Sequence, residues 1–170
     1  ETHNTTKSLT DRIRIPIRKK TEPKDVDLSP LWETWNTLEA NFLYQEPSSH
    51  LKVIAVTGTN GKSTVAYLCA QAMQYLACES MYMGTLGYGR VGELKPQANT
   101  TPSCGQLHHK LAQARDQGME VIALEASSIG IDQGRLAGVM TDVAVFTNLT
   151  HEHLDYHKTI NAYLQAKQKL

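Results

Sequence analysis

Hydrophobic and polar positions along the chain change their period several times, and each change predicts a new strand or helix. Short apolar runs bounded by glycine or polar residues predict buried strands at Val53–Val56, Ser80–Gly84, Val121–Leu124 and Val143–Phe146. Apolar residues at helical spacing predict helices at Lys62–Leu76, from Thr101-Pro102 to Gly118, and at Asn161–Leu170. This alternation predicts an α/β fold with a mostly parallel sheet that helices cover on both faces.

The first part of the chain carries weaker signals. The segment RIRIPIRKK (Arg12–Lys20) alternates isoleucine with arginine or proline, which predicts a short edge strand. A basic nucleic-acid arm and a targeting segment are alternatives, although four acidic residues between residues 1 and 25 dilute the charge. We expect residues 1–37 to be a tail or the remnant of a preceding domain.

A helix is expected after Ser29-Pro30, because this pair is typical of a helix start. Apolar residues then recur at helical spacing, at Leu31, Trp35, Leu38 and Phe42. We expect these residues and Trp32 to pack in the core rather than to form a ligand platform. The polar residues from Glu46 to Ser49 predict a loop.

Composition limits the classes of function. The 170 residues suffice for one domain with a core, and the net charge of zero argues against a nucleic-acid partner and a membrane surface. No apolar run approaches the ~18 residues that a membrane helix needs. Three cysteines without CxxC spacing argue against a disulfide framework and fit a reducing cytoplasm. Because the chain begins at Glu1 and ends within a helical pattern, we expect a fragment of a longer protein.

The stretch VIAVTGTNGKST joins the first predicted strand to the helix at Lys62 and predicts a phosphate-binding loop. Gly58 and Gly61 let the backbone approach an anion, and the helix N-terminus adds positive potential. Lys62 can reach the β- and γ-phosphates of ATP, and Ser63 can bind Mg²⁺. The general pattern G-x-x-x-x-G-K-[ST] has glycine where Val56 stands, so a polar turn with a solvated lysine is the alternative.

Acidic and histidine residues follow two other predicted strands. Glu125 stands at the carboxyl end of its strand, the ligand side of an open α/β sheet, where it can hold Mg²⁺. The stretch TNLTHEHLDYH (Thr147–His157) is rich in histidine and acidic residues, as zinc sites are, but its spacing is not HExxH. A role for His153 as a ligand of a hard cation fits the neighbouring phosphate loop better. The spacing around Lys167 indicates only a surface lysine.

Four motifs in this order resemble the central ATP-binding domain of the Mur ligases. They are TGTNGKS (Thr57–Ser63), NTTP (Asn99–Pro102), LEASS (Leu124–Ser128) and NLTHEHLDYH (Asn148–His157). The resemblance covers residues 38–170, and the form TGTNGK[ST] is the family's own version of the phosphate loop, which accounts for Val56. It implies that residues 38–170 are the first part of that domain, without the C-terminal domain that binds the amino acid.

The resemblance also implies an activity. The family forms amide bonds with ATP: the γ-phosphoryl group passes to a carboxylate, and an amine attacks the acyl phosphate. The nearest resemblance implies the third addition to the peptidoglycan stem peptide, with UDP-N-acetylmuramoyl-L-Ala-D-Glu (a UDP-muramoyl dipeptide) and an amino acid as partners. The further domains of a complete ligase are also implied as partners, so we expect the isolated chain to be inactive.

The resemblance also implies roles for single residues. It implies that ATP is held by Gly58, Thr59, Asn60, Gly61, Lys62, Ser63 and Thr64. It implies that magnesium is held by Ser63, Glu125, His153 and Lys167, the last as a carbamate. It implies catalytic roles for Lys62, Lys167 and His153. The muramoyl peptide would contact Asn99, Thr100, Thr101, Ser127, Gln133 and Arg135, and the arginine fork suits a carboxylate or phosphate.

Three positions depart from the family pattern: Ile129 and Gly134 stand where histidine occurs, and Glu152 stands where aspartate is common. Three other functions therefore stay open. The chain can belong to a P-loop NTPase that uses hydrolysis as a switch, or it can be a non-catalytic nucleotide-binding domain. It can also belong to another P-loop ligase, such as a folylpolyglutamate or cyanophycin synthetase relative.

Overall fold

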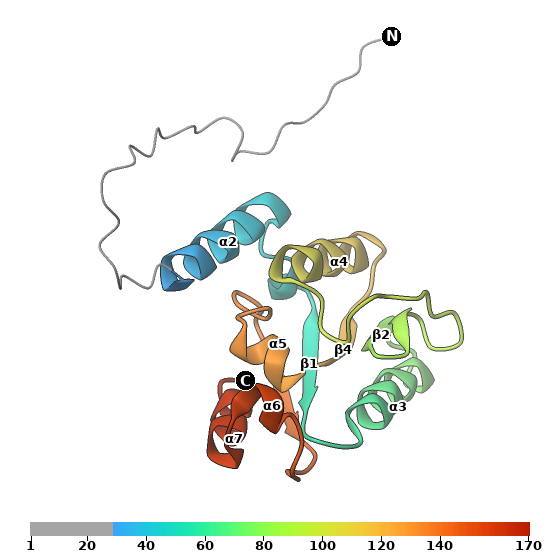
Figure 1. Cartoon of the computed structure of the whole chain (residues 1–170). Coiled ribbons are helices and arrows are strands. Elements are labelled where there is room, and N and C mark those ends of the chain that lie inside the picture. Colours follow the sequence, from blue (N-terminus) through green and yellow to red (C-terminus); the bar gives the residue numbers. More distant parts are fainter. Residues whose placement is uncertain (1–28) are drawn as a thin grey trace, which may run out of the picture.

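The structure, a computed structural model, describes residues 29–170, with the side chains of residue 35 and of residues 37–170 (Figure 1). The edge strand predicted at Arg12–Lys20 lies outside the described residues, as do the side chains of Leu31 and Trp32. In chain order the elements are α2 (Ser29–Tyr44), the 3-10 helix η1 (Pro47–His50), β1 (Lys52–Thr57), α3 (Lys62–Tyr75), β2 (Ser80–Gly84), β3 (Gly87–Gly89), α4 (Cys104–Asp116), β4 (Val121–Glu125), α5 (Ser128–Asp132), β5 (Val143–Phe146), α6 (Leu154–His157) and α7 (Ile160–Gln168).

A five-stranded sheet in the order β3-β2-β4-β1-β5 forms the centre of the molecule (Figure 1). β1 pairs in parallel with both β4 and β5, and β2 pairs in parallel with β4. The predicted α/β fold with a mostly parallel sheet is confirmed, and β2 and β5 have the predicted bounds. The sequence did not predict β3, an antiparallel strand of three residues inside the glycine-rich loop.

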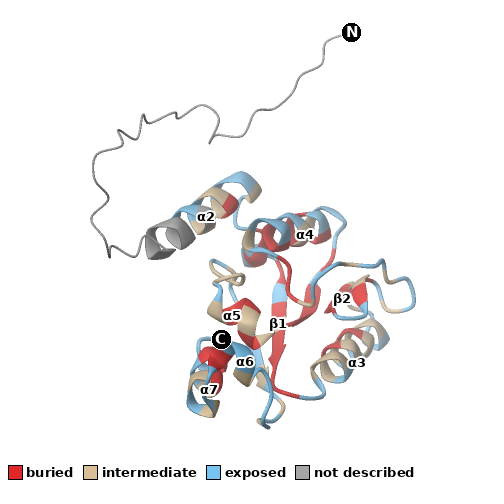
Figure 2. Cartoon of the chain, in the orientation of Figure 1, coloured by how far each residue is buried: buried red, intermediate tan, exposed pale blue. Residues whose placement is uncertain are grey.

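Alternating side chains of the strands point to opposite faces, as the period of two in a strand requires. Val53 and Ala55 of β1 belong to one cluster with Leu107 and Leu111 of α4. Val56 lies in a second cluster with Ala66 and Ala70 of α3. Helices α3 and α4 therefore cover opposite faces, and β1 and β4 are buried between them (Figure 2).

Some helices differ from the predicted ones in where they begin, and some short helices were not predicted. The helix expected from Thr101 begins only at Cys104, with Ser103 as its N-cap residue. Thr101 is outside the helix because its hydroxyl donates a hydrogen bond to the backbone oxygen of Glu125 at 3.0 Å. Helices α5 and α6 and the 3-10 helix η1 were not predicted, since four or five residues are too few to show a helical period.

The expectation that α2 buries its large apolar residues is wrong for the side chains that the structure describes. Trp35, Leu38 and Phe42 are 45%, 61% and 77% exposed. Helix α2 packs on α4, and Ala40 is its buried apolar residue among these side chains. The apolar positions predicted the helix, but the small residue, rather than the large ones, faces its neighbour.

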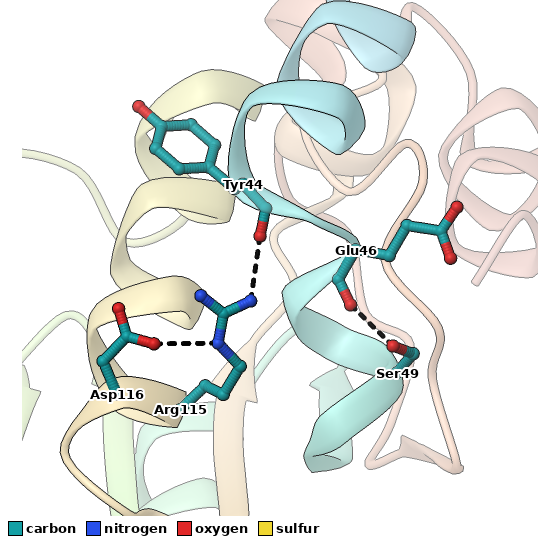
Figure 3. Close-up of polar contacts among 5 residues, drawn as sticks. All are labelled: Tyr44, Glu46, Ser49, Arg115 and Asp116. Atoms are coloured by element: carbon teal, nitrogen blue, oxygen red, sulfur yellow. Dashed lines mark hydrogen bonds and ion pairs between the residues drawn. The ribbon is translucent and has the colours of Figure 1, made fainter.

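The end of α2 is held by a side chain of α4 (Figure 3). Arg115 donates a hydrogen bond to the backbone oxygen of Tyr44 at 3.0 Å, and its Nε contacts Asp116 at 2.9 Å. Such a donor satisfies a carbonyl that the last turn of a helix leaves unpaired. Just beyond, the Ser49 hydroxyl donates to the backbone oxygen of Glu46 at 2.8 Å, which closes the turn into η1.

Residues 29–170 contain no helix that is both long and apolar enough to cross a membrane.

Candidate nucleotide and metal site

The predicted phosphate loop lies between the carboxyl end of β1 and the first turn of α3. Gly58 has a φ of 142°, and a Cβ there would overlap the hydroxyl of Thr147. Gly61, with a φ of 83°, is the N-cap residue of α3 and offers no side-chain cap. Backbone N–H groups at this helix start are thus left for an anion, where the helix dipole favours negative charge.

The loop after β5 holds the phosphate loop from the side. The backbone N–H groups of Thr59 and Asn60 donate to the backbone and side-chain oxygens of Asn148, at 2.9 and 3.0 Å. In return, Thr147 and Asn148 donate to the backbone oxygen of Asn60, at 2.7 and 3.0 Å. These bonds fix the loop conformation through a segment about 90 residues away in the sequence. Thr64, the last residue predicted to bind nucleotide, lies outside this network and is exposed on α3.

Two lysines from different helices meet at the loop. Lys62 Nζ donates to the backbone oxygens of Gly58 (3.1 Å) and Thr59 (2.6 Å). Lys167 of α7 is 3% exposed, and its Nζ donates to the same Gly58 oxygen at 2.7 Å. Burial, and next the charge of Lys62, lower the pKa of Lys167 to about 8. The spacing around Lys167 indicated a surface residue, and the structure corrects this.

Glu125 ends β4 with its side chain on the α3 face of the sheet, and it is 1% exposed. Its Oε2 accepts a hydrogen bond from the Ser63 hydroxyl at 3.0 Å. A carboxylate and a hydroxyl beside a phosphate loop form the hard-oxygen donor set that Mg²⁺ prefers. Two predicted metal ligands, Ser63 and Glu125, are therefore in direct contact.

His153 occupies a different part of the loop region. It precedes α6 with a φ of 55°, it is exposed, and its ring centroid lies 6.0 Å from that of Tyr163. Tyr163 in turn contacts the hydroxyl of Thr59 at 3.1 Å, and Lys167 Nζ lies 4.3 Å from its ring centroid. No group of three His, Cys, Asp or Glu side chains within residues 29–170 forms a ready metal site. His153 is near Lys167 through Tyr163, and the structure gives it no contact with Glu125.

The residues predicted to hold the muramoyl peptide form a row beside Glu125. Thr101 is buried, and its hydroxyl contacts the Ser127 hydroxyl at 3.1 Å. Arg135 Nη1 donates to the backbone oxygen of Thr101 at 2.7 Å, and its Nε and Nη2 contact Gln133 at 3.0 and 2.6 Å. Polar side chains from three different segments thus converge at the carboxyl ends of the strands.

Thr100 and Asn99 lie at the outer end of this row. The Thr100 hydroxyl contacts that of Thr85 at 3.0 Å, which connects the row to the Glu125 environment. Asn99 is exposed and lines a separate hollow of about 370 Å³ with Tyr88 and Lys110. The structure therefore brings together all the predicted substrate residues except Asn99.

Sequence reasoning missed several residues of the site. Tyr82 and Thr85 contact Glu125, and Asn148 and Tyr163 contact the phosphate loop. Tyr82 has no signal of its own in the sequence, because tyrosine inside an apolar run indicates only a strand. The signal that could have found Tyr82 is its place near the carboxyl end of a strand that neighbours the strand of Glu125.

Comparison with known proteins supports a relation to one enzyme family. The family described as the Mur ligase middle domain matches residues 56–170. UDP-N-acetylmuramoyl-L-alanyl-D-glutamate–2,6-diaminopimelate ligases of Xylella fastidiosa and Pseudomonas aeruginosa are each 47% identical over 131 residues. These matches cover 77% of this chain but only 26% and 27% of the relatives.

A solved structure is also similar to this chain. It is a UDP-N-acetylmuramoyl-L-alanyl-D-glutamate–2,6-diaminopimelate ligase, with a TM-score of 0.71 and 37% sequence identity. The match covers 84% of this chain and 28% of that chain. The chain therefore spans about a quarter of the length of the relatives it matches.

Proposed function

The chain belongs to the Mur ligase family, and from this premise we propose that it provides the ATP-binding part of a peptidoglycan precursor ligase. The proposed reaction joins an amino acid to UDP-N-acetylmuramoyl-L-alanyl-D-glutamate through an acyl phosphate. The names of the relatives favour 2,6-diaminopimelate as that amino acid. Residues 38–170 would act with further domains, which fits the share of the relatives that the chain spans.

One observation carries the proposal: the phosphate loop, the Ser63–Glu125 pair and the Thr101–Arg135 row lie at the carboxyl ends of the parallel strands of one sheet. Thr101 joins two of these parts, since its hydroxyl donates to the backbone of Glu125 and contacts Ser127. A carboxylate substrate bound along the row would lie close to a nucleotide bound at the loop. Phosphoryl transfer needs this proximity of acceptor and donor.

The first step would use the charge at the loop. Lys62 would bind the β- and γ-phosphates together with the N–H groups at the start of α3. A cation and amide dipoles fixed before the reaction stabilise the charge that develops on the transferred group. The hydrogen bonds that the backbone N–H groups of Thr59 and Asn60 donate to Asn148 keep the loop in position.

Ser63 and Glu125 fit a magnesium ion because both offer hard oxygen atoms, 3.0 Å apart, beside the loop. Bound there, Mg²⁺ would neutralise charge on the phosphates. We propose His153 and Lys167 for a second cation. For this role a neutral Lys167 amine would add CO₂, forming a carbamate anion and releasing a proton, and its lowered pKa favours the neutral amine.

Arg135 would bind an anionic group of the muramoyl peptide. Its guanidinium is held by Gln133 and by the backbone of Thr101, so the fork is already oriented at the end of the row. A planar, bidentate donor of this kind suits a carboxylate or a phosphate. Ser127 and Thr101 would add neutral hydrogen bonds to the same substrate.

The proposal is tested by the substrate dependence of ATP consumption by the full-length protein. We expect ADP release only when the UDP-muramoyl dipeptide and 2,6-diaminopimelate are both present, and a ligated product of matching amount. Lys62→Ala should abolish ADP release and weaken ATP binding. ATP hydrolysis at full rate without either substrate would contradict the ligase and favour a P-loop NTPase switch.

A further inference from the structure

We propose that Tyr82 is a positioning residue for the metal carboxylate: its phenol holds Glu125 Oε1, so that Oε2 alone is presented to a divalent cation beside Ser63. The inference rests on the proposed function, because it takes Glu125 as a magnesium ligand. Both side chains are buried, with Tyr82 at 0% and Glu125 at 1% exposure.

The sheet register places the phenol at this carboxylate. Tyr82 on β2 is the parallel partner of Ala123 on β4, two residues before Glu125, and all three side chains share the α3 face of the sheet. The small side chain of Ala123 leaves room for the long tyrosine to reach toward the strand end. Gly84 leaves room for the carboxylate, since a Cβ there would overlap Glu125 Oε1 and the Tyr82 hydroxyl.

The phenol has one proton, and the structure assigns it to Glu125. The backbone N–H of Leu86 donates to the Tyr82 oxygen at 3.2 Å, so that oxygen already serves as an acceptor. Its hydroxyl then donates to Glu125 Oε1.

The two carboxylate oxygens have different surroundings. Oε1 accepts from the Tyr82 hydroxyl and from the Thr85 backbone N–H at 2.8 Å. Oε2 contacts the hydroxyls of Ser63, at 3.0 Å, and Thr85, at 3.3 Å, and these residues are less buried than Tyr82. Oε1 is thus fixed inside the protein, while Oε2 faces the phosphate loop. A carboxylate held in this way binds a cation through one oxygen and does not turn to bind through two.

The test measures how strongly Mg²⁺ improves nucleotide binding by the full-length protein. The Kd of a fluorescent, non-hydrolysable ATP analogue is measured in the presence of Mg²⁺ and again in EDTA. The ratio of the Kd in EDTA to the Kd in Mg²⁺ is then compared between variants. We expect Tyr82→Phe to lower this ratio about tenfold, the size of effect that hydrogen-bond partners of metal ligands have, and to leave the Kd in EDTA unchanged. A merely structural role would weaken binding in both conditions together.

Tyr67→Phe is the matched control, because Tyr67 lies on α3 with its ring centroid 5.7 Å from that of Tyr82 and, within residues 29–170, makes no hydrogen bond to Glu125. Its ratio should equal that of the wild type. Should Tyr82→Phe not fold, Gly84→Ala replaces it, since the added methyl overlaps both Glu125 Oε1 and the Tyr82 hydroxyl and so separates the pair, and its ratio should also fall. An unchanged ratio in the folded variant overturns the inference alone. Absence of any Mg²⁺-dependent nucleotide binding by the wild type would instead overturn the proposed function.

Discussion

Lys62 and Lys167 donate hydrogen bonds to the same oxygen, the backbone carbonyl of Gly58. One lysine comes from the first turn of α3 and the other from α7. Two amines from elements far apart in the sequence therefore bind the phosphate loop. Because like charges oppose each other, the charge of Lys62 adds to the effect of burial and lowers the pKa of Lys167. The charge of Lys62 is therefore coupled to the titration of Lys167.

Carbamate formation at Lys167 should rise with pH. The pKa of the amine is lowered from 10.5 to about 8, so the neutral, reactive fraction grows as pH rises through 8. At fixed CO₂ pressure, we expect the ¹³C NMR signal of a lysine carbamate to increase between pH 7 and pH 8.5. Lys167→Arg should remove the signal.

The coupling gives this prediction a second part. Lys62→Met removes a neighbouring charge, so the pKa of Lys167 should increase and the carbamate signal should shift to higher pH. Lys169→Met is the control, because Lys169 is on the same stretch of chain but pairs with Asp132 at 2.7 Å. An identical pH profile in Lys62→Met and the wild type would show that the two lysines are not coupled.

Gly58→Ala should damage the phosphate loop more than other glycine substitutions. Its φ of 142° is rarely adopted by residues with a side chain, and a Cβ would overlap the Thr147 hydroxyl. We expect a loss of about 1–3 kcal/mol in the free energy of unfolding together with weaker ATP binding, measured by urea denaturation and by titration. Gly92→Ala shares a positive φ, at 96°, but has open space around it, so it should leave ATP binding intact.

Much of this fold is readable from local sequence. The strands β1, β2, β4 and β5 are apolar runs with clear ends, and the glycines and lysine of the phosphate loop have a defined chemical reason. The position of Glu125 at a strand end also predicted its place beside Ser63. The strands and the phosphate loop depend on neighbours within a few residues, which is why the sequence alone indicates them. Glu125 was placed instead by the rule that ligands bind at the carboxyl ends of parallel strands.

Other parts depend on packing between distant segments. Lys167 has the spacing of a surface residue, and only the docking of α7 against the loop buries it. Tyr82 needs the register of β2 on β4 to reach Glu125. The exposed Trp35 and Phe42 show the opposite case, in which an apolar pattern predicts a helix but not what covers it.

Asp142 should stabilise the fold in a pH-dependent way. Its carboxylate accepts from Lys52 Nζ at 2.8 Å and from the backbone N–H of Val53 at 2.9 Å, and these contacts lower its pKa. A lowered folded-state pKa gives stability that is present above the unfolded value near 3.8 and is lost as pH falls through the folded value. Asp142→Asn should cost about 1 kcal/mol at pH 7, since the pair is partly exposed.

The same variant should match the wild type in stability once both are measured below the folded-state pKa of Asp142. Denaturant unfolding at pH 7 and at acid pH provides the comparison. Asp116→Asn serves as the control, because Asp116 contacts only its neighbour Arg115 among the ion pairs of the described residues. A difference between Asp142→Asn and the wild type that does not change with pH would assign the effect to the shape of the side chain rather than to its charge.

Arg135→Lys should weaken binding of the muramoyl peptide and leave the nucleotide site unaffected. Arginine uses three nitrogen atoms here, contacting the backbone oxygen of Thr101 through one and Gln133 through the other two. Lysine keeps the charge but has neither the planar fork nor the fixed orientation, so a bidentate contact is lost. We expect the KM for the UDP-muramoyl dipeptide to rise about tenfold, the size of one good charged hydrogen bond, with the KM for ATP unchanged. Steady-state kinetics of the full-length protein measure both, and Lys169→Arg provides a charge-conserving control on the exposed end of α7. Equal increases in both KM values would mean that Arg135 maintains the structure at the carboxyl ends of the strands instead of contacting the substrate.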